Sequence, residues 1–580
     1  MAGIFGIIGD ISKSNIFEKS LKYLDFYKSN SIIVNDHTLL GITAFDPYSV
    51  EIFEKENYII IIAGEYYGDD MDATWSRSKI FDLFQQYGCE FIHHIDGIFN
   101  ILIFDKLKNL LYIFNDWAGG YNLFYYYKNN QFIFTTEIKG ITKIVPSLTL
   151  NKRAMIEQLM FSHMLYDHYL FNEIKLLGPA SILKYTAGNF EVINYFDLKN
   201  KYKIQSGKSE SEYIDQLYEY FEIPTKKYLN RPDIALPLTG GTDSRLLLHY
   251  ILKHNYQPKL IFTGESDQND DVKIARKICK RFNLNHRTYP IDYHFYKINF
   301  FDNYKIHDGL LPPLRYSTMR KRIFPEANFI IQYPYNNTTF GDRFTPNSKK
   351  YIGEFKANKE NIEWICNYYL KVSNETVKLL FEEEFWLYDE IKNELITDLN
   401  QFIDFPSVFI FDYFTWYQHC RRVVNLGAMD ISKLTGRLAP SQDKDLILFA
   451  FNLPFKYRYW EYLLKKMITI KAPDLAKIRR EGTNVPLSWP ENVQMFFKYY
   501  HKNIKPKFNK KENSNTYFFR SIVNDKIDKI LNSEKLKKRN TFNNDFIRRI
   551  WHEHLNGKNH AYLIHNIINI ELFYREFIDG

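Results

Sequence analysis

Cysteine is scarce in this chain of 580 residues, and none of its four cysteines belongs to a CxxC pair. Disulfide frameworks and structural zinc sites both require closely spaced cysteines, so the sequence predicts neither. The four thiols are Cys89, Cys279, Cys366 and Cys420. Their wide spacing fits a reducing compartment, and we expect a cytoplasmic protein.

Long hydrophobic runs and strong charge of one sign are missing as well. No segment approaches the ~18 consecutive apolar residues of a membrane-spanning helix, and the N-terminus lacks a basic stretch followed by an apolar one. The 76 basic residues face 68 acidic ones, for a net charge of +8. We interpret the Lys-rich pieces 503–511 and 535–539 as solvated loops, and therefore expect no membrane insertion and no nucleic-acid partner.

The first third of the chain is rich in short β-type segments. These are 2–10, 31–34, 58–65, 100–105, 109–114 and 122–127, with helical patterns near 15–27 and 77–87 between them. This arrangement is typical of antiparallel strands with flanking helices. The pattern ends near 193–198, and we interpret the polar piece 199–212 as a linker.

From Tyr213 onward, helical patterns alternate with short apolar runs at 234–238, 258–263 and 328–333. Such alternation predicts a parallel α/β sheet. The remainder, about 360–580, is mostly helical, and its aromatic stretch 409–417 predicts a buried helix, with a pocket wall as the alternative. We therefore predict two domains, residues 1–205 and residues 206–580.

A glycine turn between an apolar run and a helix start is the most informative stretch. It reads Leu238-Thr239-Gly240-Gly241-Thr242-Asp243-Ser244. Glycines permit close backbone approach, and hydroxyls beside the free amides of a helix N-terminus form an anion cradle. The turn lacks the Lys of a Walker loop and carries Asp243, which suits Mg²⁺ on a departing pyrophosphate. We therefore expect attack at the α-phosphate of ATP; the alternative is an ordinary strand-to-helix turn.

This turn resembles the SGGxDS pyrophosphate loop of the N-type ATP pyrophosphatases, and the chain as a whole resembles the asparagine synthetase family. The matching motifs are 1–6, 95–100, 115–120, 136–140 and 177–180 in the first half, then 262–265, 269–275, 425–430, Arg437, Pro440 and Asp443. The resemblance implies an α+β N-terminal Ntn-hydrolase-like sandwich of the class II glutamine amidotransferase type. An α/β parallel-sheet ATP pyrophosphatase domain with a large helical C-terminal part would follow.

In that family the N-terminal half is a glutaminase with a cysteine nucleophile at position 2. This chain has Ala2 there, Ala63 at the position of an oxyanion asparagine, and no arginine in 39–46, where a glutamine-binding arginine is expected. An engineered Cys-to-Ala change would leave the other two groups intact, so three losses favour natural decay. Asp96 matches the residue that holds the glutamine amine, although Asp before Gly is also a common turn former.

A degenerate glutaminase half also occurs in β-lactam synthetases and lasso-peptide cyclases, which resemble asparagine synthetase but use an amine of the substrate. By this resemblance the chain is an ATP-dependent ligase that adenylates a carboxylate and couples it to an amine, within one molecule or between two. Expected partners are ATP, Mg²⁺ and a substrate that is a peptide or a small molecule. A further expected partner is a protein that delivers the substrate. Two alternatives stay open: a glutamine- or ammonia-dependent asparagine synthetase with a replaced nucleophile, and a catalytically silent binding or scaffold protein.

The resemblance also implies the site of the second half. The phosphates of ATP would lie on Leu238 to Ser244, and the adenine at the strand end Phe262-Thr263. Asp243 and Asp342 would be the metal ligands and, in that role, catalytic residues. Their alternatives are a helix N-cap for Asp243 and a surface turn for Asp342.

A cation is also expected to neutralise the reacting phosphorus. The two positions at which the family has lysines are occupied by Glu461 and by Glu481. Lys465 is the catalytic cation that we select, with Lys456 and Arg458 as other candidates. The alternative for each is solvation on a helix face.

Overall fold

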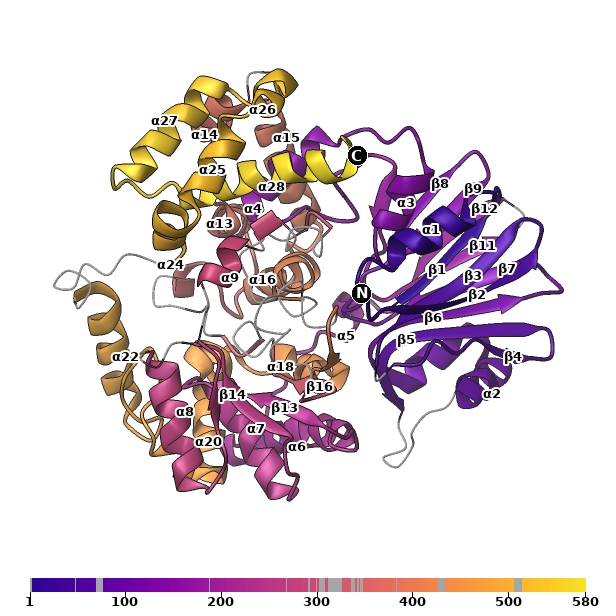
Figure 1. Ribbon diagram of the computed structural model, residues 1–580. Coiled ribbons are helices and arrows are strands. Elements are labelled where there is room, and N and C mark those ends of the chain that lie inside the picture. Colours follow the sequence, from indigo (N-terminus) through magenta and orange to yellow (C-terminus); the bar gives the residue numbers. More distant parts are fainter. Residues whose placement is uncertain are drawn as a thin grey trace.

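The computed structural model describes residues 3–46, 48–68, 77–186, 188–265, 267, 269–290, 293–298, 300–301, 308–310, 326–334, 339–341, 344, 348–381, 383–425, 433–504 and 514–579. Figure 1 shows the β-rich first part on the right, a smaller sheet with its helices at the lower left, and the late helices above that sheet. The molecule is therefore a mixed α/β protein.

Two six-stranded antiparallel sheets form the first part. Their strand orders are β10-β8-β9-β1-β3-β2 and β12-β11-β7-β6-β5-β4. The first comprises β1 (Gly3–Ile8), β2 (Lys28–Asn35), β3 (Thr38–Ala44), β8 (Phe124–Lys128), β9 (Gln131–Thr135) and β10 (Ile174–Leu176). The second comprises β4 (Phe53–Lys55), β5 (Tyr58–Gly68), β6 (Ile95–Asp105), β7 (Leu110–Asn115), β11 (Ser181–Thr186) and β12 (Asn189–Asn194). Strands β1 and β3 contact β5, so the two sheets pack face to face.

The sequence predictions for this part are largely confirmed. The predicted strands correspond to β1, β2, β5, β6, β7 and β8, and the predicted helix 77–87 is α2 (Arg77–Tyr87). Helix α1 (Ser14–Leu21) is shorter than predicted; Tyr27 beyond it donates a hydrogen bond to the carbonyl of Lys433 (2.7 Å). The linker is also shorter, because α5 begins at Leu198 and α6 (Glu210–Tyr228) begins with a Ser209–Glu212 capping box.

A five-stranded parallel sheet follows, as the alternation predicted. Its order is β15-β14-β13-β16-β17, and all of its pairings are parallel. The strands are β13 (Ile234–Pro237), β14 (Leu260–Thr263), β15 (Arg287–Thr288), β16 (Phe329–Ile331) and β17 (Gly436–Leu438). Helices α7 (Thr242–Lys253) and α8 (Asp270–Arg281) connect successive strands. The carboxyl ends of β13 and β14 therefore lie at the same edge, where open α/β sheets bind ligands.

The rest of the described chain is mainly helical. Its α-helices are α9 (Tyr293–Ile298), α13 (Lys359–Tyr369), α14 (Asn374–Leu380), α15 (Leu387–Asn400), α16 (Ser407–Phe414), α18 (Lys444–Asn452), α19 (Phe455–Arg458), α20 (Tyr462–Lys471), α21 (Pro473–Ala476), α22 (Glu491–Tyr499), α24 (Ser514–Tyr517), α25 (Asn524–Leu531), α26 (Glu534–Arg539), α27 (Asn544–Leu555) and α28 (Ala561–Phe577). The aromatic stretch 409–417 lies on α16 and the π-helical turns that follow, and Phe409, Ile410 and Phe411 are buried, so the buried-helix prediction is confirmed.

The prediction of a loop at 535–539 is wrong. These residues form α26, where the Ser533 hydroxyl accepts the backbone N–H of Leu536 and Leu536 is buried. Arg539 pairs with Glu571 at 2.9 Å and with Asp579 at 2.5 Å. Capping and these ion pairs explain why a Lys-rich segment is helical.

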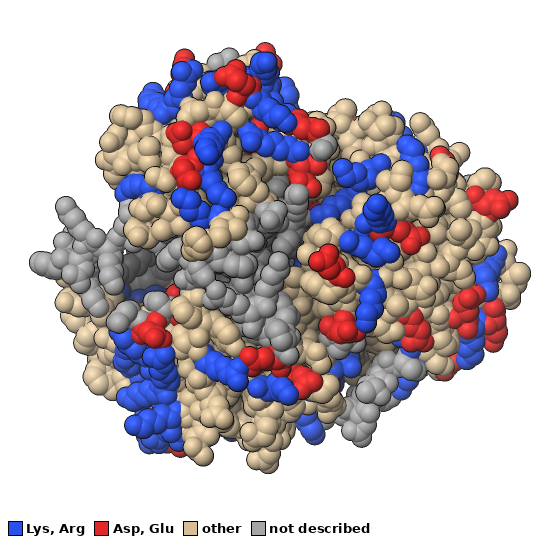
Figure 2. All heavy atoms as spheres, in the orientation of Figure 1, with Lys and Arg blue, Asp and Glu red and all other residues tan. Residues whose placement is uncertain are grey.

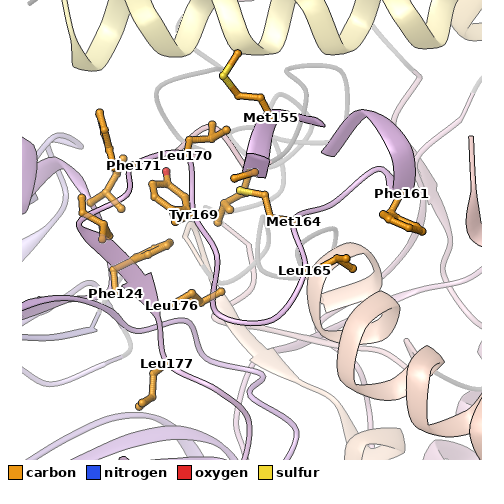
Figure 3. Close-up of a cluster of buried hydrophobic side chains, with 14 of the residues drawn as sticks. Phe124, Met155, Phe161, Met164, Leu165, Tyr169, Leu170, Phe171, Leu176 and Leu177 are labelled. Atoms are coloured by element: carbon orange, nitrogen blue, oxygen red, sulfur yellow. The ribbon is translucent and has the colours of Figure 1, made fainter. Parts of the chain in front are cut away.

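The late helix α28 packs on the first part of the chain. Tyr562 donates a hydrogen bond to the carbonyl of Leu159 on α4 (Lys152–Phe161) at 2.8 Å, across 403 residues of sequence. Figure 3 shows the buried cluster beneath α28, with Met155, Tyr169 and Leu170 labelled. The first and last parts of the chain therefore share one hydrophobic core.

Charged side chains of both signs lie on the surface (Figure 2), and the cysteines form no disulfide bonds. On the face shown in Figure 2, basic and acidic side chains lie in scattered groups among uncharged residues, with a basic gathering at the lower left near α8. All four cysteines are free thiols. Within the described ranges, no helix is both long and apolar enough to cross a bilayer.

Candidate functional site

The glycine turn lies at the carboxyl edge of the parallel sheet. It joins β13 to α7, and the neighbouring strand β14 ends at Thr263. The backbone N–H of Leu238 donates to the carbonyl of Phe262 (2.8 Å), and the Thr263 hydroxyl donates to the carbonyl of Leu238 (2.6 Å). The structure thus brings together the segments to which the sequence assigned phosphate and adenine.

Two hydroxyl groups hold the turn in shape. The backbone N–H of Thr239 donates to the Ser244 hydroxyl (3.1 Å), and the Ser244 hydroxyl also lies 3.1 Å from the Thr239 hydroxyl. The N–H of Gly241 donates to the Thr239 hydroxyl (3.2 Å). These bonds close a loop across the first turn of α7, whose opening amides have no acceptor within the helix. The arrangement provides N–H donors for an anion.

The two glycines of the turn have different surroundings. A Cβ on Gly240 would lie 2.6 Å from Ile274 and 2.9 Å from the Cβ of Glu481, so the protein itself fills this side. A Cβ on Gly241 would meet only the Thr239 hydroxyl at 3.3 Å, and the φ of Gly241 is an ordinary −72°. The space beside Gly241 is therefore the side on which the backbone can approach a phosphate.

Asp243 lies in the first turn of α7, two residues after Gly241 in the chain. The N-cap residue is Gly241 and no side chain caps the helix, so the N-cap alternative for Asp243 is wrong. The described residues contain no group of three His, Cys, Asp or Glu side chains suited to a metal ion. Mg²⁺ on nucleotides is held by one or two carboxylates together with phosphate oxygens and water. One carboxylate beside an anion cradle fits that requirement, and the second predicted ligand, Asp342, lies outside the described residues.

Arg245 positions the turn, and the sequence analysis did not single it out. Its guanidinium is fully buried and donates to the carbonyls of Gly240 (2.9 Å), Leu475 (3.1 Å) and Ile478 (2.6 Å). Burial and the nearby Arg480 lower the pKa of Arg245 to about 9. The arginine fixes the turn to the segment that follows α21.

That segment contains Glu481, at one of the two positions where the family has a lysine. Its backbone N–H donates to the carbonyl of Gly240 at 3.1 Å. Burial, and then the Asp271 carboxylate, raise the pKa of Glu481. Asp271 in turn accepts the N–H of Gly240 at 2.7 Å. Two carboxylates therefore flank the packed side of the turn, and neither supplies the missing positive charge.

The other such position is Glu461, which is fully buried. Its carboxylate lies 2.9 Å from the guanidinium of Arg480. Trp460 and Glu461 both have left-handed backbone conformations, with φ of 52° and 59°. Two consecutive non-glycine residues in this region store strain, which is common at functional sites. At the position where the resemblance implies a lysine, the structure therefore has one half of an ion pair.

Lys465 lies one turn further along α20. Its side chain is buried, and its Nζ lies 3.1 Å from the centroid of the Trp460 ring. Among the described residues, this Nζ has no hydrogen-bond partner. Burial lowers the pKa of Lys465 to about 7; Arg480 and Lys498 act in the same direction, while Glu461 and Glu491 oppose it. Lys465 also lines a cavity of about 350 Å³.

The other two candidate cations have different environments. Arg458 is buried and makes a bidentate pair with Asp412, with N–O distances of 2.5 and 2.7 Å. It also donates to the carbonyl of Thr339, so it is committed to the fold. Lys456 is exposed and lines another cavity. Of the three, Lys465 has the environment that suits proton transfer.

In the first half, the residues at the expected glutaminase site offer few hydrogen-bond donors to a ligand. Ala2 lies outside the described residues. Ala63 pairs with Asn100 on the neighbouring strand, but the Asn100 amide is directed at the carbonyls of Tyr121 and Asn122, at 3.3 and 3.4 Å. Asn100 therefore does not supply the oxyanion donor that the resemblance would place at position 63.

Two carboxylates of this region contact the second half. Glu65 is buried and pairs with Arg231 at 2.8 Å. Asp96 lies in strand β6, not in a turn, and accepts the backbone N–H groups of Gly97 (2.6 Å) and Lys444 (2.7 Å). Burial and the neighbouring Asp443 raise the pKa of Asp96. The expected glutamine-binding region thus serves as contact surface between the two halves.

Sequence comparisons give relatives for both halves. Residues 73–196 match a glutamine amidotransferase domain. "Asparagine synthetase [glutamine-hydrolyzing] 2" of Bacillus subtilis (strain 168) is 24% identical over 260 residues, which are 40% of this chain and 35% of that protein. "Putative asparagine synthetase [glutamine-hydrolyzing] 2" of Methanocaldococcus jannaschii is 21% identical over 391 residues, 60% of this chain and 73% of that protein.

A solved structure is also similar in part. The glutamine phosphoribosylpyrophosphate amidotransferase from B. subtilis, complexed with ADP and GMP, has a TM-score of 0.22 and 10% identity, covering 49% of this chain and 65% of that chain. The chain spans about a third of the length of the first B. subtilis relative. Taken together, the amidotransferase match and the low-identity relatives support a relationship to the asparagine synthetase family.

Proposed function

We propose that this protein is an ATP-dependent carbon–nitrogen ligase that activates a carboxylate and couples it to an amine. The observation that carries the proposal is the turn between β13 and α7. It combines an open side at Gly241, the opening amides of a helix and the Asp243 carboxylate at the carboxyl edge of a parallel sheet. The relatives that are named asparagine synthetases support the same class of chemistry.

ATP is a substrate of the proposed reaction. A carboxylate oxygen of the second substrate attacks the α-phosphorus while the bond to pyrophosphate breaks. The amine then attacks the activated carbonyl carbon, loses a proton, and AMP leaves. The amides at the start of α7 bind the pyrophosphate, and Arg245 holds the turn in place. When bound, Mg²⁺ would neutralise charge on the leaving pyrophosphate, with Asp243 as its protein ligand.

The proton lost by the amine needs an acceptor. Lys465 is suited to this role because its amine is buried and has a pKa of about 7, so a neutral form is present near neutral pH. A general base works best when its pKa is close to the working pH. On protonation, Lys465 supplies the positive charge that the two replaced lysines no longer provide.

The amine is proposed to belong to the substrate and not to come from glutamine. Ala63 lacks the oxyanion amide, and Glu65 and Asp96 are engaged with the second half. A tethered amine benefits from an effective molarity that can reach ~10⁵ M or more in well-oriented systems. Ring closure within one peptide or small molecule would use this gain, and a partner protein could present the substrate.

Exchange of radiolabelled pyrophosphate into ATP, in the presence of candidate carboxylates, tests the activation step. Asp243→Asn should abolish exchange while leaving the fold intact, because an amide lacks the negative charge with which a carboxylate binds Mg²⁺. The matched control is Asp215→Asn, which removes an exposed carboxylate paired with Lys471. Full exchange by the Asp243 variant would show that the metal assignment is wrong.

A second candidate is glutamine- or ammonia-dependent amide synthesis, which the amidotransferase match at 73–196 favours. Mass spectrometry of the products separates the two. Loss of one water from a single substrate supports ring closure, whereas conversion of aspartate and ammonia to asparagine supports the second candidate. A catalytically silent protein would release no pyrophosphate with any carboxylate.

A further inference from the structure

A groove outside the proposed nucleotide site crosses the connection between the two halves. It has a volume of about 780 Å³ and is lined by the linker 204–208, by Lys349 and 352–355, by 454–457 and Tyr459, and by Tyr213 of α6. None of these residues belongs to the turn at 238–244 or to the Glu461–Glu481 region. We call this cavity the linker groove. Its volume lies within the range of roughly 300–1,000 Å³ found for ligand sites.

The floor of the linker groove is apolar and aromatic. Ile352 and Tyr457 are buried beneath it, and Pro454 and Phe455 are half-buried at its side. Phe355 is 43% exposed at the rim, although it is a large hydrophobic residue. A ligand that covers this rim would remove apolar surface from water, which favours binding.

Three lysine amines surround this floor. Lys349 Nζ lies 3.7 Å from the ring centroid of Tyr459, and Lys456 Nζ lies 4.8 Å from that of Tyr457. Lys208 donates to the side-chain oxygens of Gln216 and Gln205 at 2.9 and 3.1 Å. The aromatic rings and amides therefore hold the amines at the groove without neutralising them.

The groove has an excess of positive charge. Its one carboxylate, Glu354, accepts the backbone N–H of Phe455 at the start of α19. Within the described ranges, no ion pair joins Lys208, Lys349 or Lys456 to an acidic side chain. Three ammonium groups around one helix-bound carboxylate leave a net charge that a ligand carrying several carboxylates would complement.

We propose that the linker groove binds an acidic peptide segment, in which carboxylates alternate with aromatic or aliphatic side chains. The carboxylates would contact the three lysines, and the apolar side chains would cover the aromatic floor and Phe355. Residues 204–208 line the groove together with two segments that are distant in sequence, so a peptide of several residues could contact all three. Tyr459 in its wall directly precedes Trp460, whose ring lies against Lys465, so bound peptide would adjoin the strained segment of the proposed ligase site.

Fluorescence anisotropy of labelled peptides tests the proposal without ATP, so its outcome is independent of the proposed function. The probe is a short peptide in which glutamate alternates with tyrosine and phenylalanine. The reference peptide has glutamine at every glutamate position. We expect the acidic peptide to bind about tenfold tighter or more, and its advantage to shrink as ionic strength rises from ~0.05 to ~0.5 M.

Two variants locate the site. The double variant Lys349→Ala/Lys456→Ala should weaken binding of the acidic peptide about tenfold, as expected for the loss of two partly exposed charge pairs. Lys359→Ala/Lys558→Ala changes net charge equally but lies outside the groove, and should bind as the native chain does. Ser206→Trp, at an exposed position in the wall, should block the groove sterically.

Three results would overturn the proposal. The first is equal binding of the acidic and glutamine peptides, and the second is equal weakening by the two double variants. The third is full competition by free glutamate or citrate at matched carboxylate concentration, which would assign the groove to a small anion. Circular dichroism and thermal unfolding of each variant establish that a loss of binding is not a loss of fold.

Discussion

Gly240 and Gly241 are adjacent in the turn, but an added side chain would meet different surroundings at the two positions. Gly240→Ala should lower the free energy of unfolding by about 1–3 kcal/mol, because its Cβ would overlap Ile274 and Glu481 in a packed region. Gly241→Ala should leave stability almost unchanged, since its φ of −72° suits alanine and the space beside it is open. The methyl group would, however, lie on the ligand side, and we expect at least about tenfold weaker ATP binding. Urea unfolding and calorimetric titration measure both effects. Equal behaviour of the two variants would contradict the assignment of the open side.

Lys465 offers a test of proton transfer at the level of one atom. Lys465→Met should lower kcat by about 10²–10⁴, the usual contribution of a general base. Lys465→Arg should not rescue activity, because a guanidinium stays protonated. In the native chain, kcat should fall as pH drops below about 7, where the amine takes up a proton. Lys466→Met, an exposed neighbour, is the control. A pH profile that is flat between pH 6 and 8 would rule out this role for Lys465.

The buried amine of Lys465 should also lower the free energy of unfolding. The pKa of Lys465 is about 7 in the folded protein against 10.5 for the free side chain, so folding releases its proton at neutral pH. Each pKa unit corresponds to about 1.4 kcal/mol, and the penalty is fully present below pH 7 and disappears as pH rises toward 10.5. Lys465→Met should therefore be more stable than the native chain at pH 7, with a difference that decreases at higher pH. A less stable Met variant would contradict the burial of an unpaired amine.

At the scale of elements, a buried ion pair joins α16 to α19. Asp412 and Arg458 are 2% and 1% exposed and form two N–O contacts. Asp412→Asn keeps the volume but leaves the guanidinium without a counter-charge, which should cost about 3–5 kcal/mol. Asp404→Asn, which removes an exposed partner of Lys356, should cost less than about 1 kcal/mol. Guanidinium unfolding measures both, and similar losses would show that burial does not decide the effect.

Sequence patterns predicted elements well where periodicity is local. The strands β5 and β6 and the helix α2 follow from runs of apolar residues and their spacing, and the turn at 238–244 follows from glycines and hydroxyls in order. The contacts of Arg245 with Leu475 and Ile478, and the pairing of Glu461 with Arg480, join residues that are distant in the chain. No local signal in the sequence identifies such partners. From the sequence alone, an arginine such as Arg245 would be assigned to the exposed face of its helix, although it is buried. The loop predicted at 535–539 failed for a related reason, since its helix depends on ion pairs with residues of α28 and beyond it.

At the scale of the whole molecule, the two halves contact each other at Glu65 and Asp96, in the region where the resemblance to glutaminases would place glutamine. Ala2→Cys should therefore restore little or no glutaminase activity. One missing oxyanion donor at Ala63 alone costs on the order of 10²–10³ in rate, and Glu65 and Asp96 are held by Arg231 and Lys444. Glutamate release from glutamine, measured against the native chain, is the readout. Hydrolysis by this variant at a rate typical of an enzyme, ~1 s⁻¹ or faster, would show that the site is intact apart from its nucleophile.

The packing of α28 on α4 has a consequence for how the chain comes off the ribosome. Tyr169 and Phe171, whose rings contact Phe573 of α28, are synthesised about 400 residues before it. Until α28 emerges, that apolar surface of the β-rich part faces solvent, where exposed hydrophobic patches promote aggregation. Expression of residues 1–205 alone should therefore give material that binds chaperones or precipitates. Supplying α28, either fused to this fragment or as a separate peptide, should reduce the chaperone binding and precipitation.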